Sequence, residues 1–409
     1  MPKRPLPQEP LEVILVCCGE PKKSMGWFHL TQLLTRTDVL VSAVVEPWFL
    51  GKGCKAPGAE KFQELREANA SIQFCATMDE LKPRAADAAP RLVLIAGRTC
   101  DAPTLFAAAL EKGATHIYVE KPGAESAVAL MKMREQASSR GVAVVVGYNK
   151  NVAKYACDAL AELEAAGGRG AVAAAPPLVA LEHCNDFSPG DGLVEFLRGP
   201  GGEGMLHNMC CHELALAATR FGVTCERIER VSLVADRSEL LDLGDGRWDW
   251  SRVAFKLDLK PAAGTAPAGQ VAVEEITFLA DRCGGNFSRL LVTLPAAATP
   301  GAAAEPAEPA EPAEPDQRAF RLPDPELERW IAEEQARDPE IRPYFLQQAA
   351  DYSKLKGAFV EHILAGESGI PDGVVGLDGA IEALRLADLL KPIIQKCWKT
   401  GGPWVAARQ

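Results

Sequence analysis

An alternation of short apolar runs with helix-like stretches limits the possible folds of this chain more than any other feature. The runs cover residues 11–18, 39–45, 71–75, 92–96, 115–119 and 142–146, and amphipathic stretches at 59–68, 103–112 and 125–140 lie between them. Continuous apolar runs are typical of strands that are buried on both faces, as in parallel sheets. Strands that alternate with helices predict an α/β fold with a doubly wound parallel sheet over residues 1–148.

The second half of the chain has a different pattern. Residues 231–235, 253–259, 271–279 and 288–294 read as strands with short connections and no helix between them, which predicts an open, mostly antiparallel sheet in an α+β domain. A chain of 409 residues, 47% of them hydrophobic, is long enough for two domains. We therefore predict two domains, at 1–148 and 149–409.

A low-complexity segment interrupts the second domain. Residues 304–315 are four Ala-Glu-Pro triplets. Repeated prolines favour an extended, solvated chain and are incompatible with a packed strand. We expect a disordered insert at about 296–318 that catalysis does not need.

The charge of the chain argues against nucleic acid as a partner. The formal net charge is −11, and no block of Lys and Arg could neutralise phosphates locally. Residues 1–10 are polar and rich in proline, without the apolar stretch of a secretory signal or a membrane span. The expectation is a soluble, cytoplasmic protein without a membrane or nucleic-acid partner.

The cysteines do not have the spacing of a metal site. Twelve are present, including the adjacent pairs Cys17-Cys18 and Cys210-Cys211, but no Cys-x-x-Cys occurs. We expect reduced, mostly buried thiols and no metal ligands.

A glycine turn follows the first predicted strand. Gly19 ends the apolar run, and a helix begins near Gly26 and Trp27, so free amides at the helix start could hold a pyrophosphate. The turn is longer than a standard Gly-x-Gly-x-x-Gly and lacks its middle glycine. Lys22 and Lys23 lie within it and could pair with phosphate. We predict cofactor contacts from all five residues.

An acidic residue follows the second predicted strand. Glu46 lies about 20 residues beyond the turn, where a carboxylate can accept hydrogen bonds from the adenosine ribose. Glu46 would repel the 2′-phosphate of NADP, whereas Lys22 and Lys23 would attract it. The predicted cofactor is NAD, and NADP stays open.

Two more strand ends carry polar residues. Glu120, Lys121 and Pro122 follow the run at 115–119, and Arg98 follows the run at 92–96. Parallel sheets bind their ligands at the carboxyl ends of their strands. We therefore predict that Glu120 and Lys121 contact the cofactor, that Lys121 also acts in the chemistry, and that Arg98 borders the nicotinamide. The alternative is that these are solvated strand ends.

These motifs together resemble the glucose-fructose oxidoreductase and inositol dehydrogenase family (Gfo/Idh/MocA). The likeness rests on the glycine turn with His29 three residues after Gly26, on Glu120-Lys121-Pro122, on the segment 146–150 and on the glycine-rich segment 201–212. It extends over nearly the whole chain. The resemblance implies a Rossmann domain, NAD(P)-dependent oxidoreduction and a homodimer or homotetramer formed through the second domain's sheet.

The resemblance also implies roles for residues of the second domain. Asn208 and His212 are four residues apart and would share one face of a helix. His212 would be the general acid/base, Lys121 a hydrogen-bond donor and electrostatic anchor, and Asn208 a substrate-orienting residue. Asn149 and Lys150 would contact substrate. Asn208 replaces the family's usual Asp and cannot exchange a proton as a carboxylate does.

Three functions remain open from the sequence. The first is an NAD(P)-dependent dehydrogenase or reductase that acts on a carbonyl or secondary alcohol of a sugar, cyclitol or hydroxy acid. The second is a non-catalytic regulatory or scaffold protein of the same fold, which the long glycine turn and Asn208 favour. The third is a reductase of C=N or conjugated double bonds, which would depend less on His212.

Overall fold

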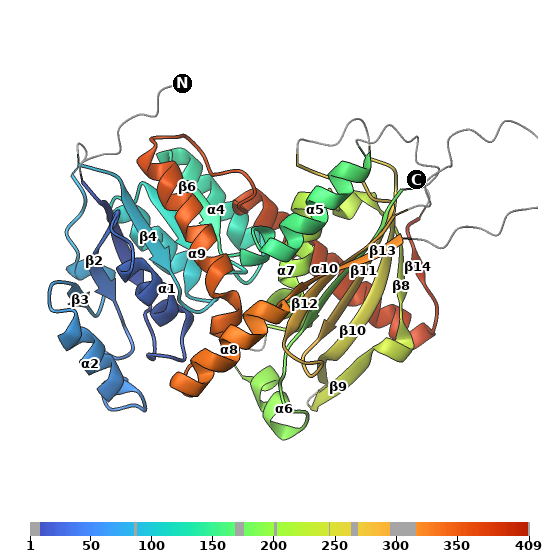
Figure 1. Cartoon of the computed structure of the whole chain (residues 1–409), viewed down its shortest axis with the longest axis horizontal. Helices are drawn as coiled ribbons and strands as arrows, with labels where there is room; N and C mark the ends of the chain where they lie inside the picture. Colours follow the sequence, from blue (N-terminus) through green and yellow to red (C-terminus); the bar gives the residue numbers. More distant parts are fainter. Residues whose placement is uncertain are drawn as a thin grey trace, which may run out of the picture. The chain divides into compact units, whose positions relative to one another are not determined.

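The chain folds into two compact units. The computed structural model describes residues 9–85, 88–167, 176–199, 203–244, 246–262, 269–294 and 316–407. The first unit comprises Met1–Val152 and Pro325–Leu384, and the second comprises Ala153–Asp324 and Arg385–Gln409 (Figure 1).

The first unit contains a parallel sheet whose strand order is β3-β2-β1-β4-β5-β6. Its strands are β1 (Leu11–Val16), β2 (Val39–Val45), β3 (Gln73–Cys75), β4 (Arg91–Ile95), β5 (His116–Val119) and β6 (Ala143–Val146). This is the order of a doubly wound Rossmann sheet. The predicted fold class is confirmed, because each apolar run forms a strand of this sheet, and most positions of β1, β4 and β5 are buried.

Helices follow most of these strands. They are α1 (Met25–Leu34), α2 (Ala59–Ala68), α3 (Ala102–Glu111) and α4 (Ala127–Arg140), with the short turns η1 (Met78–Glu80) and η2 (Asn149–Asn151). Helix α4 shows how local sequence sets the boundaries. The Ser126 hydroxyl accepts a hydrogen bond from the amide of Ala129, and Gly141 ends the helix in a left-handed conformation.

Two helices from late in the chain join the first unit. They are α8 (Pro325–Arg337) and α9 (Pro343–Leu364). Leu355, Phe359 and Val360 of α9 belong to the same buried core as Leu15 of β1 and Val44 of β2. The division differs from the one predicted at residue 148, because this apolar face packs on the N-terminal sheet and belongs to the first unit, which runs to Val152.

The second unit contains a mixed sheet in the order β13-β12-β7-β11-β10-β8-β14, with β9 paired to β10. Its strands are β7 (Leu178–Cys184), β8 (Ile228–Leu233), β9 (Glu239–Gly244), β10 (Arg247–Leu259), β11 (Glu275–Asp281), β12 (Phe287–Leu294), β13 (Asp316–Leu322) and β14 (Trp404–Val405). Strands β7 and β11 pair in parallel and the other pairs are antiparallel, which confirms the mostly antiparallel prediction.

Helices cover this sheet. They are α5 (Lys154–Gly167), α6 (Asp191–Arg198), α7 (Cys211–Arg220) and the C-terminal half of α10 (Leu377–Thr400), with the turns η3 (Met205–Met209), η4 (Cys225–Arg227) and η5 (Ala235–Arg237). Helix α5 packs on β12 and β13, and α7 packs on β7. In Figure 1, α7 and α10 lie behind the sheet. Thus helices separated by about half the chain cover one sheet.

Some boundaries differ from the sequence prediction. Strand β7, which is not among the strands predicted above, extends to Cys184 and pairs with β11 and β12. Strand β11 begins at Glu275 and not at residue 271. The predicted disordered insert overlaps β13, which begins at Asp316. The remainder of that insert, the Ala-Glu-Pro triplets included, lies outside the described residues.

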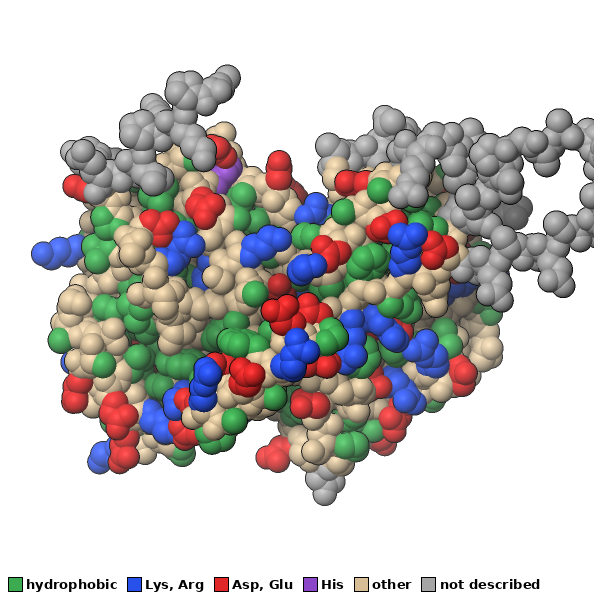
Figure 2. Space-filling view, viewed as in Figure 1, with side chains coloured by type: hydrophobic (Ala, Val, Ile, Leu, Met, Phe, Trp, Pro, Cys, Tyr) green, Lys and Arg blue, Asp and Glu red, His purple; other side chains and the backbone are tan. Residues whose placement is uncertain are grey.

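The surface carries charges of both signs. On the face drawn in Figure 2, Lys and Arg side chains are interspersed with Asp and Glu. Among the helices of the described ranges, none is long and apolar enough to cross a membrane.

Candidate functional site

The first unit brings most of the predicted cofactor and substrate residues to one edge of its sheet. Each follows the carboxyl end of a parallel strand, where α/β sheets bind ligands. They are Gly19 after β1, Glu46 after β2, Arg98 after β4, Glu120 and Lys121 after β5, and Asn149 and Lys150 after β6. This edge is the candidate active site of the first unit.

The glycine turn is shaped by two close approaches. A Cβ on Gly19, which has φ +72°, would lie 2.5 Å from the Ser24 hydroxyl oxygen. A Cβ on Gly26 would lie 2.0 Å from the carbonyl oxygen of Cys17. Both positions therefore require glycine. They leave little side-chain bulk at the start of α1, and such a turn fits the pyrophosphate of a dinucleotide.

Glu46 is folded into this turn and is not free at the end of β2. Its carboxylate accepts hydrogen bonds from the amides of Gly19 (2.7 Å), Trp48 (3.0 Å) and Phe49 (3.3 Å). The residue is 2% exposed. The predicted ribose contact therefore stays a prediction, and it requires the Glu46 side chain to move. Sequence patterns do not show this position of the carboxylate, because its partner Gly19 is 27 residues away in the chain.

Both lysines of the turn are paired with carboxylates of the first unit. Lys22 lies 2.7 Å from Asp338 and 3.2 Å from Glu340, and Lys23 lies 2.6 Å from Glu20. The hydrogen bond that Lys22 donates to Asp338 is the main cause that raises the pKa of Lys22. A cofactor phosphate would have to compete with these carboxylates. Of the other predicted contacts, Trp27 is half-buried in the core and Arg98 is exposed.

The carboxyl end of β5 is held by a buried chain of hydrogen bonds. Glu120 Oε1 accepts from the Tyr118 hydroxyl (2.9 Å) and lies 2.8 Å from Nε2 of His29. The other ring nitrogen of His29 lies 2.9 Å from Nζ of Lys356, which also donates to Gln32 Oε1 at 2.5 Å. The sequence reading did not find Lys356 or Gln32.

Burial and charge set the protonation of this chain. Burial, helped by the charge of Lys356, lowers the pKa of His29 to about 4. Burial also lowers the pKa of Lys356 to about 7. Burial alone would raise the pKa of Glu120, but the hydrogen bond from His29 and further contacts with Tyr118 and Lys121 hold it below its ordinary value. A neutral imidazole thus lies beside an ionised carboxylate.

A second buried polar cluster joins η2 to α9. Asn149 and Lys150 are buried, and the Asn149 amide donates to Gln348 Oε1 at 2.9 Å. Asp351, 5% exposed, faces the same cluster, and burial raises its pKa to about 7 although Lys354 and Lys150 act to lower it. Asn149 Oδ1 and Asp351 Oδ2 find no hydrogen-bond partner within the described ranges. Such orphaned oxygens suit a bound ligand or water.

His212 and Asn208 lie in the second unit. His212, 2% exposed, belongs to α7, and its ring meets that of His183 edge-on at 5.9 Å. His183 Nδ1 lies 3.2 Å from Glu213 Oε2. Asn208 lies in η3, and its amide donates to Glu203 Oε2 at 3.2 Å.

The prediction of one continuous helix through Asn208 and His212 is wrong. The π-helical turn η3 ends at Met209, and α7 begins at Cys211. The four-residue spacing therefore does not by itself put the two side chains on one face. Gly201 and Gly202, which the resemblance includes, lie outside the described residues.

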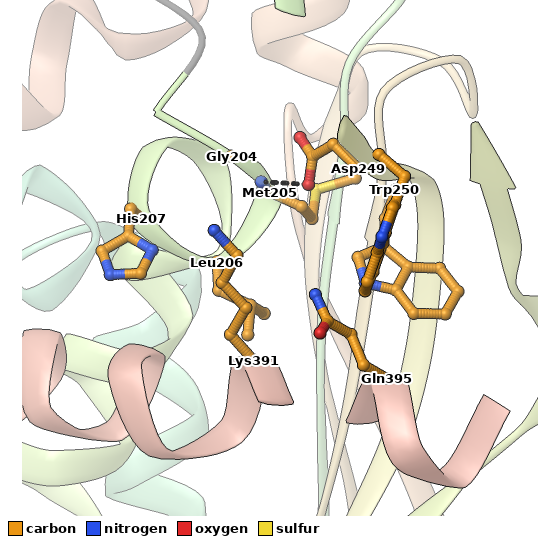
Figure 3. Close-up of a pocket in the computed structure, with 9 residues that line it drawn as sticks. Gly204, Met205, Leu206, His207, Asp249, Trp250, Lys391 and Gln395 are labelled. Atoms are coloured by element: carbon orange, nitrogen blue, oxygen red, sulfur yellow. Dashed lines mark hydrogen bonds between the residues drawn. The ribbon is translucent and has the colours of Figure 1, made fainter. Parts of the chain in front are cut away.

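An open pocket of about 400 Å³ also lies in the second unit, beside η3. Its lining includes Glu203, Trp248, Asp249, Lys391 and Gln395. Figure 3 shows the adjoining narrow cavity, where Lys391 and Gln395 extend from α10 toward the turn and Asp249 accepts a hydrogen bond from the amide of Met205 at 3.0 Å. Local sequence patterns do not point to these pocket residues, because they come from three segments that are far apart in the chain.

The described residues contain no cluster of three or more His, Cys, Asp or Glu that could hold a metal ion. All twelve cysteines are free thiols.

Known proteins share the fold. Residues 52–148 match the model of an oxidoreductase family with an NAD-binding Rossmann fold, Gfo/Idh/MocA. A search of curated protein sequences finds no match. Similar solved structures include three inositol dehydrogenases.

The myo-inositol dehydrogenase from Corynebacterium glutamicum is 17% identical, with a TM-score of 0.62 over 98% of this chain and 100% of that one. The myo-inositol 2-dehydrogenase from Lactobacillus plantarum is 13% identical, with a TM-score of 0.62 over 98% and 100%. The scyllo-inositol dehydrogenase from Lactobacillus casei, solved with NAD(H) and scyllo-inositol, is 14% identical, with a TM-score of 0.60 over 97% and 99%.

These comparisons confirm the resemblance to the Gfo/Idh/MocA family and the NAD-binding Rossmann fold of the first unit. The matched range contains strands β3 to β6 and the Glu120-Lys121-Pro122 motif. At identities this low, the solved structures show a shared fold and not a shared substrate.

Proposed function

We propose that the protein is an NAD-dependent oxidoreductase that interconverts a secondary alcohol and a carbonyl on a small polar molecule, such as a sugar, cyclitol or hydroxy acid. The observation that carries this proposal is the match of residues 52–148 to an NAD-binding oxidoreductase family, since this range contains the strand end with Lys121. Glu46 favours NAD over NADP, because its charge would repel a 2′-phosphate.

The first unit would hold the cofactor and part of the substrate. Gly19, Gly26 and Trp27 would border the pyrophosphate at the start of α1, with Lys22 and Lys23 nearby, and Arg98 and Glu120 would border the nicotinamide end. The bound nicotinamide accepts or donates the hydride. Asn149 and Lys150 would bind substrate hydroxyls, and the unpaired oxygens of Asn149 and Asp351 support a polar ligand there.

The protein itself must move the hydroxyl proton. In alcohol oxidation, His212 would accept that proton as a neutral imidazole, because its ordinary pKa lies near neutrality. Lys121 would donate a hydrogen bond to the substrate oxygen and stabilise negative charge as it develops. Asn208 would orient the substrate.

Assembly and location also follow the resemblance. We infer a homodimer or homotetramer formed through the sheet of the second unit, in a soluble cytoplasmic protein. Light scattering coupled to size-exclusion chromatography would give the mass of the assembly. A single-chain mass would contradict this part of the proposal.

A kinetic screen tests the activity. Polyols, sugars and hydroxy acids are offered with NAD⁺, and 2-oxo acids and keto sugars with NADH, while absorbance at the NADH band is followed. With an active substrate, Lys121→Ala and His212→Ala should each lower kcat/KM by roughly 100-fold or more. The control variants are Lys132→Ala on an exposed site of α4 and His207→Ala on η3.

Two other outcomes have meaning. Loss of activity in Lys121→Ala but not in His212→Ala would support the C=N or double-bond reductase. Two contacts favour a non-catalytic regulatory or scaffold role. The Glu46 carboxylate accepts a hydrogen bond from the Gly19 amide in the glycine turn, and Lys22 is paired with the Asp338 carboxylate. Folded protein that turns over no substrate with either cofactor would support that role.

A further inference from the structure

Helix α9 places a lysine deep inside the first unit, against α1, the helix that follows the glycine turn. Lys356 is 4% exposed, and its Nζ lies 2.9 Å from Nδ1 of His29 on α1. The same Nζ donates to Gln32 Oε1, one turn further along α1, at 2.5 Å. A buried lysine is costly unless its protons have partners. Here they do, which indicates a position that the fold maintains.

The hydrogen bonds define which atoms carry protons. Lys356 can only donate to Nδ1 if that nitrogen is unprotonated, so the single proton of a neutral imidazole lies on Nε2. Nε2 faces Glu120 Oε1 at 2.8 Å and donates to it. The hydrogen bonds thus connect the amino group of Lys356 to the neutral ring of His29, and that ring to the carboxylate of Glu120. Each donor has an acceptor in this series.

The neighbours leave this chain little freedom. A Cβ on Gly147 would lie 2.7 Å from both Glu120 Oε1 and the Tyr118 hydroxyl, so only glycine lets the carboxylate sit there. The His29 ring packs edge-on against Tyr118 at 5.4 Å and Tyr352 at 5.3 Å. The arrangement is therefore fixed from β5, β6, α1 and α9 together.

Two charged side chains act on the Lys356 ammonium group, one after β5 and one after α1. Glu120 on β5 attracts its charge, and Arg36 just after α1 opposes it. Arg36 is itself paired with Asp38 at 2.7 Å and lies 3.9 Å from Glu361 of α9. The Tyr352 ring lies 5.5 Å from Nζ. Lys356 is thus connected to the carboxylate of Glu120 by hydrogen bonds through His29.

We propose that Lys356 is a positioning residue: by occupying Nδ1 of His29 it keeps the imidazole neutral, and so leaves the negative charge of Glu120 available to the adjacent Lys121. This inference rests on the proposed function only in the role given to Lys121. The relay itself stands on the hydrogen bonds within the first unit. Lys356 touches neither substrate nor cofactor in this account.

The consequence of removing Lys356 follows from the geometry. With Nδ1 free, His29 can take a second proton and form an ion pair with Glu120. The positive charge then sits on the ring in contact with Glu120 and compensates it. The charge that Lys121 sees is reduced, and α9 loses its side-chain hydrogen bonds to His29 and Gln32 of α1.

Nuclear magnetic resonance tests the relay without any activity. Long-range ¹H–¹⁵N spectra of protein labelled in its six histidines distinguish Nε2–H, Nδ1–H and doubly protonated rings. The His29 signals are identified as those missing in His29→Gln. In the unaltered protein we expect a neutral Nε2–H ring from pH 5.5 to 9. An Nδ1–H ring, or a ring that protonates between pH 6 and 7, would overturn the proposal.

The variant Lys356→Met tests the causal step, since Met has nearly the same length and no charge. We expect the His29 titration midpoint to rise by at least two pH units, to above pH 6. Lys354→Met is the matched control on the same helix, because Lys354 donates to the Val152 carbonyl and not to His29. Equal His29 titrations in Lys356→Met and the unaltered protein would overturn the proposal.

Cofactor binding then tests the effect on Lys121. We expect Lys356→Met to weaken NADH binding roughly tenfold at pH 6, the size expected for one lost hydrogen bond to a charged group, and to approach the unaltered protein at pH 9. Lys354→Met should follow the unaltered protein throughout. An unchanged pH profile would overturn the positioning role. Failure of the unaltered protein to bind NADH would instead contradict the proposed function, and the His29 titration would still decide on the relay.

Discussion

Helix α9 carries two buried charged residues five positions apart, and their surroundings differ. Around Lys356, each nitrogen of the lysine and of His29 meets a partner in the first unit. Around Asp351, the oxygens Asn149 Oδ1 and Asp351 Oδ2 have no hydrogen-bond partner among the described residues. Buried polar atoms are normally paired. The satisfied cluster therefore suits a positioning role, and the unsatisfied cluster suits a ligand.

The largest expected effect comes from breaking the satisfied cluster at its acid end. Glu120→Leu leaves the Tyr118 hydroxyl, His29 and the buried Lys356 without their carboxylate. We expect a loss of about 3 kcal/mol or more in the free energy of unfolding, as for a buried ion pair that loses one partner. Urea denaturation measures it, with the exposed Glu125→Leu as control. A loss below about 1 kcal/mol would show that the cluster is not a unit.

Removing the lysine of the same cluster should instead increase the free energy of unfolding. The pKa of Lys356 is lowered to about 7 by burial, so between pH 7 and its unfolded value the unfolded chain binds the extra proton. Stability contributed by this group therefore rises with pH across that window. Lys356→Met removes the penalty and should stabilise the protein by about 2 kcal/mol at pH 6, with less effect toward pH 10.

Urea denaturation of Lys356→Met at pH 6, 8 and 10 checks this trend, with Lys354→Met as control. A variant that is less stable than the unaltered protein at pH 6 would mean that the hydrogen bonds of Lys356 outweigh the cost of burying its charge.

The unsatisfied cluster should respond to pH in the other direction. Burial raises the pKa of Asp351 to about 7, so between its unfolded value and pH 7 the folded chain holds the extra proton. Stability contributed by this group falls as pH rises through that window. Asp351→Asn should therefore be neutral near pH 4 and stabilising by about 1 to 2 kcal/mol at pH 8.

The same variant tests the ligand role. If Asp351 binds a substrate hydroxyl, Asp351→Asn should raise KM more than it lowers kcat. A stabilised Asp351→Asn enzyme with an unaltered KM would assign this cluster to structure alone.

The smallest effect is expected at the surface of the glycine turn. Asp338→Asn with Glu340→Gln frees Lys22 from its two ion pairs. Exposed ion pairs contribute at most about 1 kcal/mol, so NADPH binding should tighten by no more than about fivefold, and less at high salt. NADH binding should change less. Equal changes for both cofactors would show that Lys22 does not approach the 2′-phosphate.

The comparison also shows what the sequence could reveal. The strands and the ends that carry Glu46, Lys121 and Asn149 follow from local apolar runs, because the position of a residue after a buried strand is a local property. Lys356 has no such signal. It reads as a charged position on an amphipathic helix, and its partner His29 is 327 residues away.

The errors have the same origin. Glu46 lies where the sequence predicts, but its carboxylate accepts a hydrogen bond from the amide of Gly19, which is 27 residues earlier in the chain. The spacing of Asn208 and His212 suggests one helix, but Asn208 lies in a π-helical turn that ends at Met209 and His212 lies in α7. In each case contacts that are distant in sequence, or an inserted residue, decide a geometry that local patterns leave open.

The central claim is that the glycine turn of the first unit binds NAD. Equilibrium titration of the full chain with NADH and NADPH, followed by nicotinamide fluorescence, tests it most directly. We predict saturable NADH binding below about 1 mM, tighter than NADPH and weakened in Lys121→Ala but not in Lys132→Ala. Folded protein that binds neither cofactor at about 1 mM would contradict the account, because the carboxylate of Glu46 would then be the permanent occupant of the turn.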